Sequence, residues 1–425
     1  MEFKDYQDLY ESGQLKTPAY IFDIDVLQRR ISYIRSRLPG IGICYAMKAN
    51  AFLVSSARDL VDSFEICSPG EERICRKAGI PADKMVLSGV NKEASDFEDI
   101  FRFVKDHADG GEPICTVESL QQMKMLEEQV GNVFGQDHTI GVLLRVTSGT
   151  QFGMEEEELL SLVRERGSYP HLHILGIQVF TGTQKKLRTI KKEIADADAL
   201  IAKIENECGY KVEMFEFGPG APVSYFKKET PVNDEELLRQ LYESLMSMNW
   251  KGMISLEMGR YIAASCGSYI TKIMDMKTNR GVNYLICDGG IHQVNYFGQM
   301  MAMKLPYMLD KGGEVPLPAA APAGSTVAQA GSSVTARVDT DPGSDREICT
   351  ICGSLCTIND VIVKEVPLQH PQAGDILVFM NVGAYSVTEG ISLFLSRDLP
   401  RVYRKCGDSL ILLRDKIQTE DFNYG

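Results

Sequence analysis

Short apolar runs alternate with amphipathic stretches from about residue 20 to residue 265, and this alternation restricts the fold more than any other feature. Nine runs have the length and composition of buried strands: AYIFDI, IGICYAM, SFEIC, KMVLSG, EPICTVES, TIGVLLRV, ILGIQVF, EMFEFG and MISLEMG. Helical patterns lie between them, the longest being RTIKKEIADADALIAKIENECG. Buried strands separated by helices favour parallel pairing with the helices outside. Eight or nine such units predict a closed (β/α)8 TIM barrel over residues 23–265 rather than an open sheet.

The pattern changes after residue 266 to β-rich runs separated by turns. The runs SYITKIMDMK, NYLICDGG, VIVKEVPL, GDILVFMNVGAY, RVYRK and LILLRD predict a second, mainly antiparallel β domain over residues 266–425. Within it, residues 312–345 are rich in Ala, Pro, Gly, Ser and Thr and contain no aromatic residue. Such a segment buries little apolar surface, so we expect a low-complexity mobile loop there.

The charge balance and the apolar runs argue against several classes of function. Lys and Arg total 45 against 58 Asp and Glu, a formal net charge of −13, so the chain repels a phosphate backbone and we expect no nucleic-acid partner. No apolar run reaches the ~18 residues of a membrane span. The acidic N-terminal stretch MEFKDYQDLYESGQ is unlike a secretory signal. These features predict a cytoplasmic protein with no membrane partner.

The eleven cysteines lie mostly inside apolar runs, which indicates free thiols in a reducing compartment rather than a disulfide framework. Cys349, Cys352 and Cys356 have a spacing that resembles part of an iron–sulfur motif, but no fourth thiolate or histidine is near them in the sequence. The pair His171 and His173 also lacks an evident third ligand. We therefore predict no metal site.

Lys48, in YAMKAN, stands at the end of a buried apolar run. An ammonium desolvated without a partner costs free energy, so a lysine is unusual there. Two interpretations are open from the residues alone. Lys48 is either a lysine that extends to solvent just past the strand, or a nucleophile whose pKa is lowered by burial so that it forms a Schiff base.

Eight motifs occur in one order along the chain: YAMKAN, FEICSPGE, GIQVFTGTQ, FGPG, LEMGR, ICDGG, GSLC and NVGAY. In this order they resemble the fold-type III decarboxylases that use pyridoxal 5'-phosphate (PLP), the family of the diaminopimelate and ornithine decarboxylases. The resemblance covers almost the whole chain except the Ala/Pro-rich segment. It implies an alanine racemase-like architecture in which residues 1–22 join the β domain. It also implies a homodimer with active sites at the subunit interface.

The reaction implied by the resemblance removes the α-carboxylate of an amino acid or amino-acyl conjugate as CO2 and leaves an amine. Lys48 matches the lysine that binds PLP covalently and later releases the product. Glu257, in LEMGR, matches the carboxylate that keeps the pyridine nitrogen protonated. The remaining positions expected to contact the cofactor, mainly at its phosphate, are Thr183, Gly218, Gly220, Gly259, Arg260 and Tyr385. Glycines let backbone N–H groups approach an anion, and Pro219 removes one such N–H from this cradle.

Phe180 departs from the family pattern, in which a histidine stacks on the PLP ring. A phenyl ring keeps the stacking surface but loses a titratable group. The variant GIQVFTGTQ, together with TQFGME and GSLCTIND, resembles the subgroup that contains the carrier-protein-linked glutamate decarboxylase of aminoglycoside side-chain synthesis.

Cys356, in GSLC, matches a cysteine that one subunit contributes to its partner's site and that protonates the α-carbon after decarboxylation. The pKa of a thiol suits this general-acid work. Thr357 replaces the family's glutamate that recognises the distal amine of diaminopimelate, which argues against free diaminopimelate as substrate. Two roles are open for Asp360, the next acidic residue: binding the amine of a diamine precursor, or positioning Cys356.

The run QKKLRTIKK (184–192) follows the FTGT strand, so in a barrel it would lie at the active-site rim. It is either a solvated helix face or a docking patch for an acidic carrier protein. The basic residues of this run are Lys185, Lys186, Arg188, Lys191 and Lys192.

Two other functions share these features. An amino-acid racemase of the same fold needs a tyrosine acid/base opposite Lys48 and usually lacks a carboxylate at the pyridine nitrogen, so Glu257 argues against it. A catalytically inactive PLP-binding homologue that acts through a partner is compatible with Phe180 and Pro219. The presence of both Lys48 and Cys356 argues for an enzyme.

Overall fold

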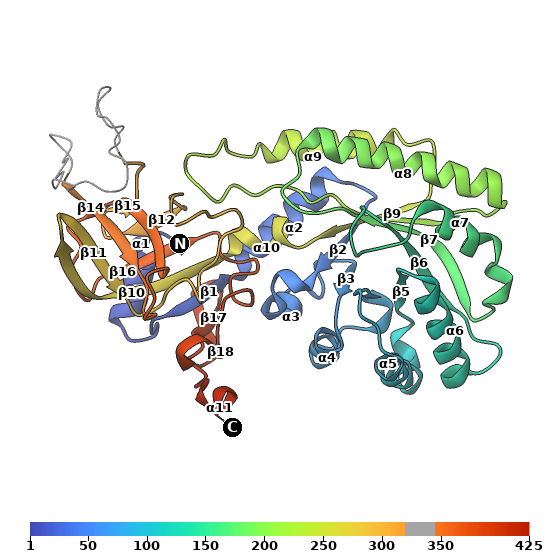
Figure 1. The fold of residues 1–425 in the computed structure, drawn as a ribbon, viewed down its shortest axis with the longest axis horizontal. Helices are drawn as coiled ribbons and strands as arrows, with labels where there is room; N and C mark the ends of the chain where they lie inside the picture. The colour runs from blue at the N-terminus through green and yellow to red at the C-terminus, as the bar shows by residue number, and fades with distance from the viewer. Residues whose placement is uncertain (319–344, 425) are drawn as a thin grey trace. The chain divides into compact units, whose positions relative to one another are not determined.

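The computed structural model describes residues 1–318 and 345–424, which divide into two compact units (Figure 1). The barrel unit comprises Gln28–Val223 and Val232–Ile262. The β unit comprises the described residues of Met1–Leu27, Ser224–Pro231 and Ala263–Gly425. Residues 224–231 fall within the range expected for the barrel domain but cluster with the β unit. Most of the expected loop over 312–345 lies outside the described residues, and Gly313–Glu314 near its start form strand β13.

The barrel unit is built on a closed sheet of eight parallel strands in chain order, which confirms the predicted TIM barrel (Figure 1). The strands are β2 Gly42–Ala46, β3 Ser63–Ile66, β4 Met85–Leu87, β5 Ile114–Val117, β6 Ile140–Val146, β7 Leu172–Phe180, β8 Met214–Gly218 and β9 Met253–Met258. The last strand closes the sheet by pairing with the first, with Cys44 opposite Glu257. Active sites of this fold form where the strands end, so we expect the active site in the loops that follow these strands.

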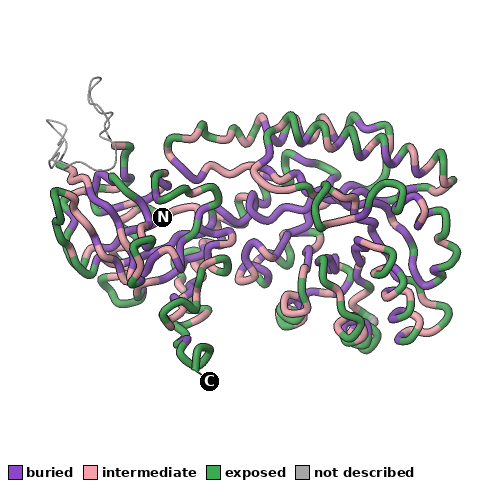
Figure 2. Tube along the Cα trace, in the orientation of Figure 1, coloured by how far each residue is buried: buried purple, intermediate pink, exposed green. Residues whose placement is uncertain are grey.

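Helices lie before, between and after these strands, and the longer ones alternate between buried and exposed residues (Figure 2). The helices are α2 Ile24–Arg37, α3 Val54–Ala57, α4 Pro69–Lys77, α5 Ala94–Asp106, α6 Leu120–Phe134, α7 Glu156–Arg164, α8 Leu187–Cys208, α9 Asp234–Met246 and α10 Arg260–Ala263. The longest, α8, buries Ile190, Ile194, Ile201 and Ile204, whose spacing places them on one face. It ends at Gly209, whose left-handed φ of 57° suits glycine.

The β unit contains a mixed sheet of ten strands in which most pairs are antiparallel, as predicted. The strands are β1 Ala19–Asp23, β10 Gly267–Asn279, β11 Val282–Cys287, β12 Met308–Asp310, β13 Gly313–Glu314, β14 Arg346–Cys352, β15 Val361–Gln369, β16 Ile376–Met380, β17 Arg401–Cys406 and β18 Ser409–Arg414. The main path runs β13-β12-β16-β10-β1-β17-β18, and β11, β14 and β15 continue from β10. The parallel pairs are β1 with β17 and β11 with β14.

Strand β1 lies inside this sheet, between β10 and β17, and four of its five residues are buried. Helix α1 (Phe3–Glu11) packs against the same core through Tyr6, whose hydroxyl donates a hydrogen bond to Ser268 Oγ at 3.0 Å. The N-terminal segment is therefore part of the β unit's core. A short helix, α11 (Glu420–Asn423), lies near the end of the chain. Within the described ranges, no helix combines the length and apolar character needed to cross a membrane.

Candidate active site

The amine of Lys48 lies between carboxylates from the two strands that flank β2. Its Nζ is 2.7 Å from Glu65 Oε2 on β3 and 3.3 Å from Glu257 Oε1 on β9. The register of the three strands explains why these groups lie together, because Ala46 of β2 pairs with Glu65 of β3 and Tyr45 of β2 pairs with Met258 of β9. Lys48 itself follows β2 in a short 3-10 turn. Three neighbouring strands thus bring one amine and two acids together at the end of the barrel.

The electrostatics of Lys48 differ from the expectation for a nucleophile. Burial lowers its pKa, but Glu65 and Glu257 together outweigh burial and hold the pKa well above its ordinary value. The lowered pKa that belongs to one of the two open interpretations is therefore not found in this arrangement, because two buried carboxylates lie beside the amine. Burial raises the pKa of Glu65, but the Lys48 charge outweighs it and the net direction is down. Burial and the charge of Glu65 raise the pKa of Glu257.

A third buried acid extends this cluster. Gln178 Nε2 on β7 donates to Glu216 Oε1 on β8 at 3.0 Å and to Glu257 Oε2 at 3.3 Å. Glu216 is fully buried, and burial together with the neighbouring carboxylates raises its pKa to about 8. If all three buried acids were ionised, they would carry more negative charge than the single lysine amine neutralises. At least one of the three carboxyl groups therefore holds a proton at neutral pH.

Phe180 ends β7 with its ring over this cluster, 5.4 Å from Lys48 Nζ to the ring centroid. Gly218 is its register partner on β8, and a Cβ at that position would lie 2.3 Å from the phenyl ring. Gly218 therefore makes room for the aromatic ring. Gly259 has a similar packing role, since a Cβ there would lie 2.9 Å from both the Ala46 carbonyl oxygen and Ala49 Cβ. It lets β9 approach the segment that carries Lys48.

Two turns pack together beside Phe180. Gly220 has a left-handed φ of 58°, and a Cβ on it would lie 2.1 Å from the Gly182 carbonyl oxygen. The Lys185 backbone N–H donates to the Gly220 carbonyl at 2.9 Å. Thr183, in the first of these turns, accepts a hydrogen bond from Arg260 Nε at 3.2 Å. The structure thus brings the expected phosphate-binding residues of the barrel unit into one place.

The predicted residues of the β unit fall into two turns. Cys356 is exposed and Thr357 half-buried in the turn that follows β14. The buried Asp360 carboxylate accepts backbone N–H groups from Leu355 at 2.6 Å and Ile291 at 2.9 Å, which fixes this turn. This geometry favours the positioning role for Asp360 over amine binding. Tyr385 has a φ of 69°, a strained value for a bulky residue that often marks functional positions.

Sequence reasoning missed three members of the cluster, Glu65, Gln178 and Glu216. Each is a buried polar residue with an apolar residue on either side in its strand, in SFEI, LHILGIQVF and MFEFG. A buried polar side chain without a partner is costly, so three such interruptions in strands of one barrel indicate that their side chains meet. That signal was present in the sequence.

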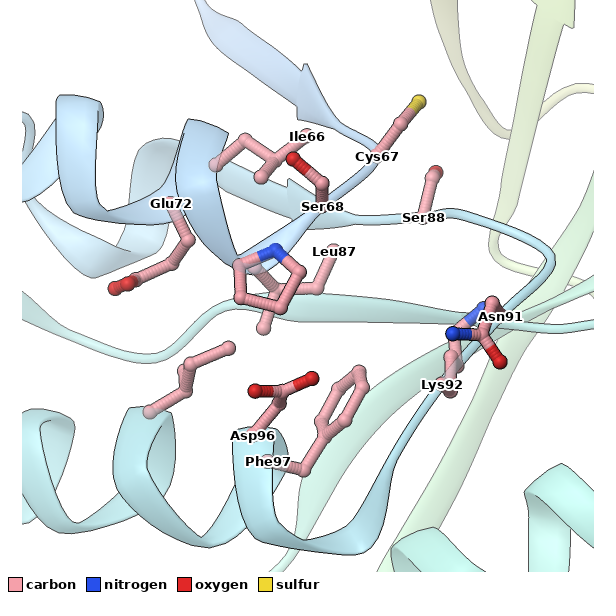
Figure 3. A pocket seen from close by; sticks show the side chains of 12 residues that line it. Ile66, Cys67, Ser68, Glu72, Leu87, Ser88, Asn91, Lys92, Asp96 and Phe97 are labelled. Carbon is pink, nitrogen blue, oxygen red and sulfur yellow. The ribbon is translucent and has the colours of Figure 1, made fainter. Parts of the chain in front are cut away.

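A small pocket lies beside the cluster, between the loops after β3 and β4 (Figure 3). Its volume is about 20 Å³, room for a single water molecule. The sulfur of Cys67, which lines this pocket, is 3.7 Å from Lys48 Nζ. Lys92, also on the lining, donates to the Gly89 carbonyl, and burial lowers its pKa to about 8. The lowered lysine pKa expected at Lys48 is thus found at Lys92.

The basic run 184–192 is less uniform than its sequence indicates. Lys185 is buried, and its Nζ lies 2.6 Å from Glu193 Oε2 and 3.2 Å from the Gly218 carbonyl oxygen. It belongs to the internal structure and is not available to a docking partner. Lys192 is exposed and pairs with Asp196 at 2.6 Å. The remaining basic residues, Lys186, Arg188 and Lys191, are exposed.

The described residues contain no cluster of three or more His, Cys, Asp or Glu side chains placed to hold a metal ion. All eleven cysteines are free thiols.

Comparison with known families identifies the barrel. Residues 24–264 match the family model described as pyridoxal-dependent decarboxylase, pyridoxal binding domain. The chain belongs to the pyridoxal-dependent decarboxylase family. Among curated relatives, it is 25% identical over 426 residues to the L-glutamyl-[BtrI acyl-carrier protein] decarboxylase of Niallia circulans, covering 96% of this chain and 93% of that protein. It is 24% identical to the diaminopimelate decarboxylase of Zymomonas mobilis, covering 96% and 92%.

A solved structure supports the same fold. The diaminopimelate decarboxylase of Helicobacter pylori, complexed with L-lysine, superposes with a TM-score of 0.76 at 22% identity, covering 98% of each chain. The family and its relatives establish the class of reaction. This decarboxylase uses PLP as its cofactor and removes the α-carboxylate of an amino acid or amino-acyl conjugate as CO2. The racemase and inactive-homologue alternatives are thereby set aside.

Proposed function

We propose that the cluster around Lys48 is the catalytic centre and that Lys48 is the residue to which PLP attaches. The residues present fit this cofactor. A phenyl face, a buried carboxylate and an amine lie within a few ångströms of one another, and neither Gly218 nor Gly220 has room for a Cβ. When bound, PLP supplies an electron sink for the pair left on the α-carbon as CO2 departs.

Each residue of the barrel unit then has a distinct task. Glu257 holds the pyridine nitrogen in its protonated form, and Phe180 stacks on the ring. Thr183, Gly218, Gly220 and Arg260 would hold the phosphate, and Tyr385 stays a predicted contact of the cofactor. Lys48 must lose a proton before it acts as a nucleophile, and its ion pair with Glu65 at 2.7 Å orients the amine while it is charged. Gly259 packs against the segment that carries Lys48, and its expected contact with the cofactor stays a prediction.

We also propose that the active enzyme is a homodimer in which Cys356 protonates the α-carbon in the partner's site. Cys356 is exposed, and Ile358 in the same turn is 95% exposed. Met301 and Met303 are a further exposed apolar pair of the β unit. Exposed apolar side chains of this kind are typical of surfaces that a second chain covers. The two hydrogen bonds to Asp360 hold the turn in which Cys356 is presented.

The substrate we propose is an amino-acyl group tethered to an acyl carrier protein. The relative from Niallia circulans acts on such a substrate by its name. Thr357 offers no carboxylate for a distal amine. Lys186, Arg188 and Lys191 form an exposed basic surface where β7 leads into α8, at the end of the barrel that holds Lys48. An acidic carrier protein is complementary to this surface.

The eleven free thiols support a cytoplasmic location, and the acidic chain has no evident nucleic-acid site.

The single observation that carries the proposal is the pairing of Lys48 with Glu65 and Glu257 under the Phe180 ring. It is tested by CO2 release from two matched panels. One holds free glutamate, lysine, ornithine, arginine and diaminopimelate, and the other holds the same residues as carrier-protein thioesters. We expect turnover of a tethered substrate by the wild-type enzyme and none by Lys48→Ala. Turnover of free diamino acids alone would contradict the tethered substrate and leave the Lys48 assignment intact.

A charge-reversal pair tests the docking surface separately. Lys186→Glu with Lys191→Glu should raise KM for the tethered substrate without changing kcat. The control is Lys211→Glu, an exposed residue before β8 at the opposite end of the barrel, which should leave KM unchanged. If the double variant and the Lys211→Glu control have the same KM for the tethered substrate, the docking surface is refuted.

A further inference from the structure

The β unit contains a pocket of about 420 Å³ that the proposed reaction does not use. Every residue of its lining belongs to the β unit, and none is among the residues proposed to hold the cofactor or to protonate the substrate. Its charged and titratable lining residues are Lys272, Asp288, His292, Arg397, Asp398, Arg401 and Lys416. The volume is within the range of pockets that bind small organic molecules.

His292 is the clearest sign that this pocket is built for a ligand. The residue is only 3% exposed, and both of its ring nitrogens are buried without a hydrogen-bond partner in the described part of the chain. Buried polar groups nearly always have partners, because an unpaired one costs free energy. Burial and the nearby Arg397 charge lower the His292 pKa to about 4. At neutral pH the ring therefore offers one donor and one acceptor.

The cations around His292 are only partly neutralised. Lys416 pairs with Asp398 at 2.9 Å, and Arg401 pairs with Asp415 at 2.7 Å. Lys272 Nζ has no ion pair or hydrogen bond among residues 1–318 and 345–424. Arg397 uses one Nη2 hydrogen bond, to the Ser354 carbonyl, and keeps other donors.

Asp288 adds one negative charge to this pocket and offsets at most one of these two cations, because the groups that donate to its carboxylate are neutral. It accepts hydrogen bonds from Thr17 Oγ1 at 2.6 Å, Thr271 Oγ1 at 2.7 Å and the Lys272 backbone N–H at 2.9 Å. The pocket therefore combines an unpaired ammonium, a guanidinium with spare donors and an unpaired imidazole. This set of groups matches an oxyanion.

We propose that this pocket binds a small organic molecule bearing a carboxylate or phosphate group, with Lys272 and Arg397 pairing its charge next to the buried His292. The site is separate from the PLP site, so its ligand binds to the holoenzyme.

The test is isothermal titration of the PLP-loaded enzyme with inorganic phosphate and, in a second arm, succinate, at constant ionic strength. PLP fills the active-site phosphate cradle and keeps the probes out of it. We expect saturable binding of one probe per chain. Lys272→Met should weaken this binding at least about tenfold, because one charge-assisted hydrogen bond is lost. The matched control is Lys277→Met, a half-exposed lysine of the same strand outside the pocket, which should bind like the wild type.

Binding of phosphate alone identifies a phosphate ligand, and binding of succinate alone identifies a carboxylate ligand. Either result supports the site if Lys272→Met weakens it. A second readout is the imidazole ¹⁵N resonance of His292, assigned by its loss in His292→Gln, which should shift as the probe saturates. Absence of saturable binding by either probe, or equal affinity in wild type and Lys272→Met with an unmoved His292 resonance, would overturn the proposal.

Discussion

Glu216 is the residue whose burial has the plainest consequence for stability. Its pKa in the folded protein is about 8, raised mainly by burial, whereas an unfolded glutamate has its ordinary value near 4.5. Between these two values the folded state retains a proton that the unfolded state has lost. The stability contributed by the protonated form is complete below the lower value and is lost as pH rises through the upper one.

Glu216→Gln should therefore remove this pH dependence. A neutral amide resembles the protonated acid, so variant and wild type should have similar Tm values near pH 5. The variant should become the more stable protein toward pH 8.5, by an amount on the order of 5 °C. Scanning calorimetry across this range measures the difference. Glu128→Gln, an exposed position on α6, should show a constant difference. If the Tm difference between Glu216→Gln and the wild type is also the same at every pH, Glu216 is ionised in the folded protein.

At the scale of elements, Lys185 joins the turn before α8 to the glycine turn after β8. Its side chain is 8% exposed and its partner Glu193 12% exposed, so this ion pair is shielded from solvent. Removing one partner of a buried pair leaves an uncompensated charge, which typically costs about 3–5 kcal/mol. Because the same turn carries Thr183, the loss should also loosen the phosphate-binding side of the site.

Lys185→Met should thus lower the free energy of unfolding by about 3 kcal/mol or more and weaken PLP binding. Lys192→Met is the matched control from the same run, since its pair with Asp196 is exposed and should contribute at most about 0.5 kcal/mol. Urea unfolding and PLP titration measure the two effects. If both variants lose the same small stability, Lys185 does not connect the turns as described.

The elements also show what the sequence could predict. Barrel strands were recognisable because burial on both faces leaves continuous apolar runs, as in β2 and β4. Helices α5, α7 and α9 and strands β12 to β14 were not singled out: α7 begins with a run of glutamates and β12 spans three residues. The pairing of Lys48 with Glu65 depends on strand register across the barrel, which no local pattern contains. The burial of Lys185 depends likewise on a turn from a different strand.

At the scale of the whole molecule, the proposed dimer divides each active site between two chains, with Lys48 from one and Cys356 from the other. Lys48→Ala and Cys356→Ala homodimers would each be defective at both sites. Mixing the two variants and letting subunits exchange at random would make half of the dimers mixed. Each mixed dimer would hold one site with both residues intact and one site with neither.

Activity in the mixture should therefore recover to about a quarter of the wild-type value, measured as formation of the amine product after dissociation and reassociation. The control mixture combines Lys48→Ala with Glu257→Gln, two residues of the same barrel unit 3.3 Å apart. Every site in that mixture lacks one of the two, so no recovery is expected. Recovery confined to the first mixture would mean that Cys356 crosses between chains. Activity no higher than the sum of the separate parents would mean that each chain completes its own site, and the exposed turn around Cys356 would then need another explanation.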